Sequence, residues 1–167
     1  ERRPSTPSAG FTVGTPRQFW QTWRDEEERD ETIDPLANRP LTAAEADAVF
    51  SGDFAFARAH FEDLAAEGAR AITAQDRAIH AMCRPERLLD LIRRFTVFDG
   101  GARKVARHQQ FFGIRKAVER VHQFNLDGRR KGGVIWHTQG SGKSLTMVML
   151  GRALALDKAI SNPRILI

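Results

Sequence analysis

The apolar residues in the first two thirds of the chain recur at helical spacing. The clearest stripe lies within residues 84–98 and consists of Leu88, Leu91, Ile92 and Phe95. Residues three or four positions apart share one face of a helix, so this spacing predicts an amphipathic helix. Similar spacing predicts helices over residues 54–65, with Gly68 as the stop, and over residues 105–124. This part of the chain is therefore predicted to be a scaffold of helices.

Two further helices are predicted nearer the N-terminus. Thr42, followed three residues later by Glu45, has the pattern of a capping box and predicts a helix that begins there. A shorter helix is predicted from Pro16 into the acidic cluster, with a break at Pro35. Its aromatic pair, Trp20 and Trp23, is expected to pack onto a core; an exposed contact surface is the alternative. Residues 1–15 have linker composition, with a short strand at 11–13.

The pattern changes sharply after residue 132. Residues 133–136 form a short apolar run that predicts a buried strand, and a glycine-rich turn follows it. The next residues carry an apolar helical stripe made of Leu145, Val148, Met149 and Leu150. Residues 164–167 are apolar again and predict the start of a second strand. Strand, glycine loop and helix in this order are the first unit of an α/β nucleotide-binding domain.

The glycine-rich turn matches the phosphate-binding pattern GxxxxGK[ST], except that His137 stands in the place of the first glycine. The turn reads His137-Thr138-Gln139-Gly140-Ser141-Gly142-Lys143-Ser144. Gly140 and Gly142 would let successive N–H groups converge on phosphate oxygens, helped by the positive end of the following helix. Lys143 would reach the β- and γ-phosphates, and the Ser144 hydroxyl would be a ligand of Mg²⁺. A chance match in a surface turn is the alternative, which the flanking strand and helix disfavour.

Composition places few limits on function. The formal charge of +5 and the pI near 10.1 favour a polyanionic partner, and the positive charge gathers between Arg93 and Lys131. Solvated helix faces are the alternative, and a charge run taken alone favours them. The single cysteine, Cys83, excludes an intramolecular disulfide. There is no apolar run long enough for a membrane span and no signal-peptide pattern, so a cytoplasmic protein with no membrane partner is expected.

The run Gly132-Gly133-Val134-Ile135-Trp136-His137-Thr138-Gln139-Gly140-Ser141-Gly142-Lys143-Ser144-Leu145 closely resembles the R subunit of type I restriction endonucleases. Residues 104–112 and 88–95 resemble the segments that precede it in that family. The family tolerates histidine at the first position of the loop, which accounts for His137. The resemblance implies a superfamily 2 helicase-like motor with two RecA-like domains, which uses ATP and Mg²⁺. It also implies that Gln110, in an Arg-x-x-Gln pattern, contacts the adenine; a helix-surface glutamine without a ligand is the alternative.

The resemblance sets the expected organisation of the chain. The fold class is α/β, with a mainly helical connector over residues 1–98 and the start of the first RecA-like domain over residues 99–167. The parent protein would translocate double-stranded DNA and cleave it, in a complex with specificity and methyltransferase subunits. The nuclease and Walker B motifs are not found here, so the chain alone is not expected to cleave DNA. Another P-loop helicase and a non-catalytic connector that contacts DNA are the rival interpretations.

Overall fold

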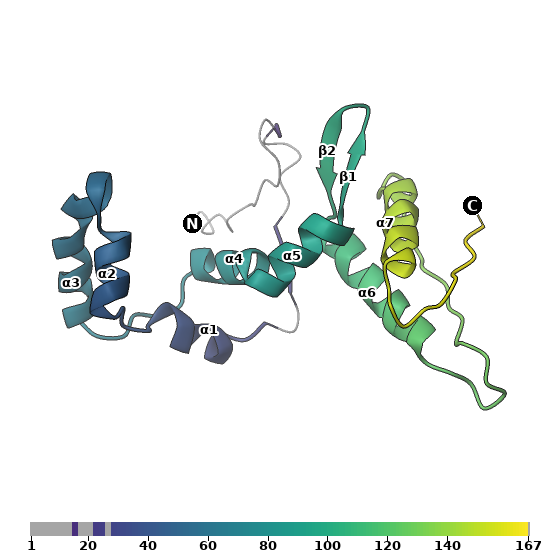
Figure 1. Ribbon diagram of the computed structural model, residues 1–167, viewed down its shortest axis with the longest axis horizontal. Coiled ribbons are helices and arrows are strands. Elements are labelled where there is room, and N and C mark those ends of the chain that lie inside the picture. The colour runs from purple at the N-terminus through teal and green to yellow at the C-terminus, as the bar shows by residue number, and fades with distance from the viewer. Residues whose placement is uncertain (1–14, 17–21, 26–27, 167) are drawn as a thin grey trace, which may run out of the picture. The chain divides into compact units, whose positions relative to one another are not determined.

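The structure is a computed structural model, which describes residues 15–16, 22–25 and 28–166 (Figure 1). The chain divides into two compact units. Glu26–His80 forms one, here called the acidic unit because 13 of its residues are Asp or Glu and only 5 are Arg or Lys. The flanking segments Glu1–Asp25 and Ala81–Ile167 form the other, here called the core unit. Among the described residues, no helix is long and apolar enough to cross a bilayer.

The acidic unit is built from short helices. They are α1 (Asp30–Ala37), α2 (Ala43–Val49), the 3-10 helix η2 (Gly52–Ala57), α3 (Arg58–Ala66) and the first seven residues of α4 (Ala74–Cys83). The predicted capping box of α2 is confirmed, because the Glu45 N–H donates to Thr42 Oγ1 (3.3 Å) and the Thr42 N–H donates to Glu45 Oε2 (2.9 Å). Helices α2, η2 and α3 contain no buried residue.

Ion pairs, more than apolar packing, join the segments of the acidic unit. Arg77 makes two bonds to Asp30 (2.7 and 2.6 Å), and Arg70 makes two to Asp76 (2.6 and 2.7 Å). The guanidinium of Arg70 and the Thr73 hydroxyl hold the pKa of Asp76 below its ordinary value. Bidentate pairs of this kind fix the geometry of both partners, so polar contacts set the relative positions of α1 and α4 within the unit.

The core unit contains α5 (Pro85–Arg94), β1 (Thr96–Asp99), β2 (Ala102–Val105), α6 (His108–His122) and α7 (Lys143–Ala155). Its buried core consists of Leu91, Phe95, Ala106, Phe111, Ile114, Met149 and Ala153. The rings of Phe95 and Phe111 have centroids 4.5 Å apart. Trp23 packs against the same core, 5.4 Å from the Phe111 ring, as expected for an apolar face. Trp20 lies outside the described residues.

A buried ion pair fixes the segment that carries Trp23. Arg87 donates to Asp25 Oδ2 (2.9 Å), and both side chains are almost fully buried. The guanidinium of Arg87 also lies 4.6 Å from the centroid of the Phe111 ring. Burial lowers the pKa of Arg87, and its hydrogen bond to Asp25 opposes that effect. Residues 22–25 are therefore held against α5 and α6 although they form no helix.

Several predicted elements need correction. The helix predicted to break at Pro35 instead begins at Asp30 and includes that proline, since a two-turn helix loses only one backbone bond to it. The helix predicted over 84–98 ends at Arg94, where β1 follows. Neither 133–136 nor the described part of 164–167 forms a strand. A strand requires a hydrogen-bonded neighbour, and the described residues supply none to these segments. The strand predicted at 11–13 lies outside the described residues.

Candidate nucleotide-binding site

The turn that leads into α7 is closed by its own hydrogen bonds. Gly140 and Gly142 have φ values of +77° and +86°, a region that a Cβ atom disfavours. The Ser141 N–H and its hydroxyl both donate to the Thr138 carbonyl, at 3.3 and 2.7 Å. His137 Nδ1 lies 3.2 Å from Ser141 Oγ. The two glycines therefore occupy positions that require them, and His137 contributes to the turn by contacting a serine within it.

Helix α7 begins directly after the turn. Its first residue is Lys143, and the preceding Gly142 provides no side-chain cap. The first N–H groups of a helix have no partner within the helix and carry its positive dipole end, so this terminus favours an anion. The side chains of Lys143 and Ser144 are exposed beside these groups. A cation, a hydroxyl and free helix N–H groups thus lie together, which suits a phosphate group.

Gln110 is brought to this turn from α6. Its side chain is 3% exposed, and its Nε2 donates to the Gly142 carbonyl at 3.1 Å. Its Oε1 accepts the Arg107 N–H at 2.9 Å, the reciprocal bond of a capping box at the start of α6. The two residues that the sequence assigned to one nucleotide site, 32 positions apart, are therefore in contact. The adenine contact of Gln110 stays a prediction.

The Gly142 carbonyl anchors the turn to two helices. Besides Gln110, it accepts the Thr146 N–H at 3.0 Å and the Thr146 hydroxyl at 3.2 Å. The Thr146 side chain is buried at 3% exposure. Sequence reasoning did not assign this threonine a role. The available signal was a hydroxyl four residues after the second glycine of the loop, since a helical threonine commonly bonds the carbonyl four residues earlier.

The remaining residues predicted to bind the nucleotide lie at the surface. Thr138, Gln139 and Gly140 are exposed, and the approach to the turn is open. Val134 and Trp136, just before the turn, are 91% and 89% exposed. The predicted site is therefore a solvent-exposed loop, and Val134 and Trp136 beside it are not packed.

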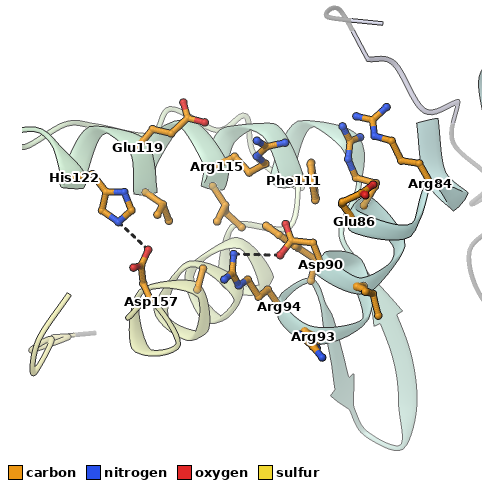
Figure 2. Close-up of a pocket in the computed structure, with 16 residues that line it drawn as sticks. Arg84, Glu86, Asp90, Arg93, Arg94, Phe111, Arg115, Glu119, His122 and Asp157 are labelled. Atoms are coloured by element: carbon orange, nitrogen blue, oxygen red, sulfur yellow. Dashed lines mark hydrogen bonds and ion pairs between the residues drawn. The ribbon is translucent and has the colours of Figure 1, made fainter. Parts of the chain in front are cut away.

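A cavity of the core unit lies away from this turn. It has a volume of about 540 Å³ and is bounded by α5, α6 and the C-terminal part of α7 (Figure 2). None of residues 137–144 is among its described lining residues. Figure 2 shows two pairs among its charged side chains: His122 points to Asp157 (2.8 Å), and Arg94 points to Asp90 (3.3 Å). The Ala159 N–H and His122 hold the pKa of Asp157 below its ordinary value.

The described residues contain no cluster of three or more His, Cys, Asp or Glu side chains able to hold a metal ion. Ser144 provides one exposed hydroxyl in the first turn of α7. Magnesium in nucleotide sites takes one or two protein oxygens and completes its shell with phosphate oxygens and water. Ser144 therefore fits the part of one protein ligand.

Comparison with known proteins finds a matching family model and several relatives. A model of the SWI2/SNF2 ATPase family matches residues 109–167, which include Gln110 and the turn. The chain is 35% identical over 95 residues to the type I restriction enzyme HindI endonuclease subunit of Haemophilus influenzae, covering 53% of this chain and 9% of the relative. A protein of Methanocaldococcus jannaschii, named for the MjaIXP endonuclease subunit of a type I restriction enzyme, is 30% identical over 95 residues, covering 54% and 9%. No solved structure matches.

The curated relatives of this chain are type I restriction endonuclease subunits. The resemblance read from residues 132–145 is thereby confirmed. The ATPase family match is consistent with a RecA-like helicase domain. The chain spans less than a tenth of the length of these type I relatives.

Proposed function

We propose that this chain is the part of a type I restriction endonuclease subunit that binds ATP for DNA translocation. Residues 137–144 would hold the triphosphate, with Thr138, Gln139 and Ser141 contributing to the loop. Lys143 would contact the β- and γ-phosphates, and the Ser144 hydroxyl would hold Mg²⁺, which neutralises phosphate charge when bound. The observation that supports this most directly is the contact of Gln110 with Gly142 at the first turn of α7.

The proposal extends to the whole protein. Its substrate would be double-stranded DNA, which it would translocate and cleave in a complex with specificity and methyltransferase subunits. The predicted boundary, with a connector over 1–98 and the motor domain from 99, is kept as part of the proposal. Lys143 supplies the phosphate grip alone, because hydrolysis also needs a positioned water and a second group on the metal. We expect those groups outside this chain.

Substitution of Lys143 tests the phosphate grip. In the complete subunit, Lys143→Ala should remove ATP-dependent translocation and weaken ATP binding, because the cation facing the phosphates is lost. Lys158→Ala is the matched control, since Lys158 is an exposed lysine in the turn after α7. Translocation is measured by the displacement of a DNA triplex. ATP binding is measured by calorimetry. If the Lys143→Ala protein translocated DNA at the rate of the unmodified protein, the proposed role in ATP-driven translocation would be refuted.

Gln110 has two candidate roles, which nucleotide choice can separate. If its amide reads adenine, Gln110→Ala should weaken ATP binding more than GTP binding, because GTP lacks the matching groups. If it serves only to anchor Gly142, both nucleotides should lose affinity equally. The measurement is the ratio of ATP to GTP dissociation constants in the unmodified and Gln110→Ala proteins. If this ratio is unchanged, Gln110 does not recognise adenine and serves only to anchor Gly142.

A further inference from the structure

The β1–β2 hairpin projects from the core unit. Its strands pair Thr96 with Val105 and Phe98 with Arg103, and Gly100 and Gly101 form the turn with φ of +57° and +79°. Paired residues of antiparallel strands point to the same face. Phe98 and Arg103 therefore share one face near the tip, while Lys104 and Asp99 share the other. Figure 1 shows the hairpin extending away from the junction of α5 and α6.

The two faces of the hairpin differ in charge. On one face, Lys104 forms an ion pair with Asp99. On the other, Arg103 is exposed and makes no hydrogen bond or ion pair within the described part of the chain. Its cross-strand neighbour Phe98 is 74% exposed. An unneutralised guanidinium beside a bare aromatic ring is therefore presented to solvent at the tip.

The base of the hairpin is bonded to the helix that follows the candidate nucleotide loop. The Arg152 guanidinium, in α7, donates to the Thr96 carbonyl at 2.8 Å. The Thr96 hydroxyl donates to the Leu91 carbonyl of α5 at 2.9 Å. Val97 and Val105 pack against the buried core. Arg152 lies nine positions after Lys143 in α7, about 13.5 Å along the helix, so one helix contacts both the loop and the hairpin.

We propose that the β1–β2 hairpin contacts duplex DNA through Arg103 and Phe98. This inference rests on the proposed function, and it names the surface of this chain that meets the DNA. A guanidinium matches a phosphate in geometry and charge, and a two-stranded ribbon fits the major groove. The exposed ring of Phe98 supplies apolar contact with sugar or base edges. The hydrogen bond from Arg152 to Thr96 connects the hairpin to α7, the helix that also bears Lys143.

The test measures binding of the complete subunit to a short fluorescent duplex over a series of salt concentrations. Arg103→Gln should lower affinity about fivefold and reduce the slope of log K against log salt by about 1, because one phosphate contact is lost. Phe98→Ala should also lower affinity but leave that slope unchanged. Arg103→Lys should restore the slope. Lys104→Gln is the matched control: it removes the same charge from the opposite face, and its effect should stay below about twofold.

Each outcome decides the proposal. Equal losses for Arg103→Gln and Lys104→Gln would mean that only overall charge matters, and would overturn it. Unchanged duplex binding together with weaker binding to a protein subunit would also overturn it, in favour of a protein contact. Equal melting temperatures show that the exposed substitutions leave the fold intact. The proposed function fails separately, if the unmodified subunit shows no ATP-dependent activity on DNA.

Discussion

Replacing Gly142 by alanine perturbs the point where α6, α7 and the candidate loop meet. The backbone there has a φ of +86° and a ψ of 39°. A Cβ at this position would lie 2.8 Å from Gln110 Nε2, closer than real Cβ contacts. The substitution therefore strains the backbone and also displaces the amide that bonds the Gly142 carbonyl.

The two effects have separate magnitudes. A left-handed conformation costs an alanine about 1–2 kcal/mol relative to glycine. Displacing the Gln110 amide gives up one hydrogen bond, worth about 0.5–1.5 kcal/mol. Gly142→Ala should therefore destabilise the chain by the sum of the two, about 1.5–3.5 kcal/mol. Gly140→Ala is the matched control, because its φ is +77° and nothing lies within 4 Å of the added Cβ. It should cost only the backbone part, about 1–2 kcal/mol.

A double-mutant cycle isolates the contact with Gln110. In a Gln110→Ala background the close approach is gone, so Gly142→Ala should cost only the backbone part. The expected coupling between the two sites is about 1 kcal/mol. The free energy of unfolding of the four proteins is measured by urea titration, with far-UV circular dichroism as the signal. A coupling within about 0.3–0.5 kcal/mol of zero would refute the contact, since independent sites add to that precision.

Two further predictions concern the ionic contacts. Asp25→Asn should destabilise the core unit by about 3–5 kcal/mol, because it leaves the buried guanidinium of Arg87 unpaired. The double variant Asp25→Asn with Arg87→Met should recover much of this loss. Urea titration measures the free energy of unfolding of both variants. Glu45 has its pKa lowered from 4.5 to about 2 by its bonds to Arg39 and Thr42. Because the folded pKa is the lower one, stability from Glu45 is complete above about pH 4.5 and is lost as pH falls toward 2. The loss at low pH is measured by the chemical shifts of the amide protons of α2. Glu45→Gln should abolish this acid transition, and high salt should weaken it in the unmodified protein.

The helices were predictable from sequence because their signals are local. The stripe of Leu88, Leu91, Ile92 and Phe95 placed a helix whose Leu91 is buried, and the Thr42 and Glu45 spacing placed a cap. The end of α5 was predicted too late. Phe95 continues the helical spacing, but its N–H bonds the Leu91 carbonyl as a C-cap and the chain then turns into β1. Packing of Phe95 against Phe111 decides this, and a pattern read along the sequence does not contain it.

Long-range pairing explains what sequence reasoning missed at the candidate site. The contact of Gln110 with Gly142 joins residues 32 positions apart, and no local pattern specifies it. The hairpin was also missed, although Gly100-Gly101 is a strong turn signal, because apolar spacing on both sides reads as helix. Conversely, 133–136 has strand composition, yet it forms no strand without a neighbour. Composition describes a preference, and the hydrogen-bonded partner decides the outcome.

The two units differ sharply in charge. The acidic unit holds 13 Asp and Glu against 5 Arg and no Lys, so the rest of the chain carries 21 of the 26 basic residues and 8 of the 21 acidic ones. DNA repels a segment with such an acidic excess and attracts its basic complement, because phosphate contacts dominate affinity. If the parent protein moves along DNA, the contacts from this chain must therefore come from the core unit. Within the described residues of that unit, Arg103 of the hairpin is an exposed cation with no acidic partner, and the exposed ring of Phe98 lies beside it.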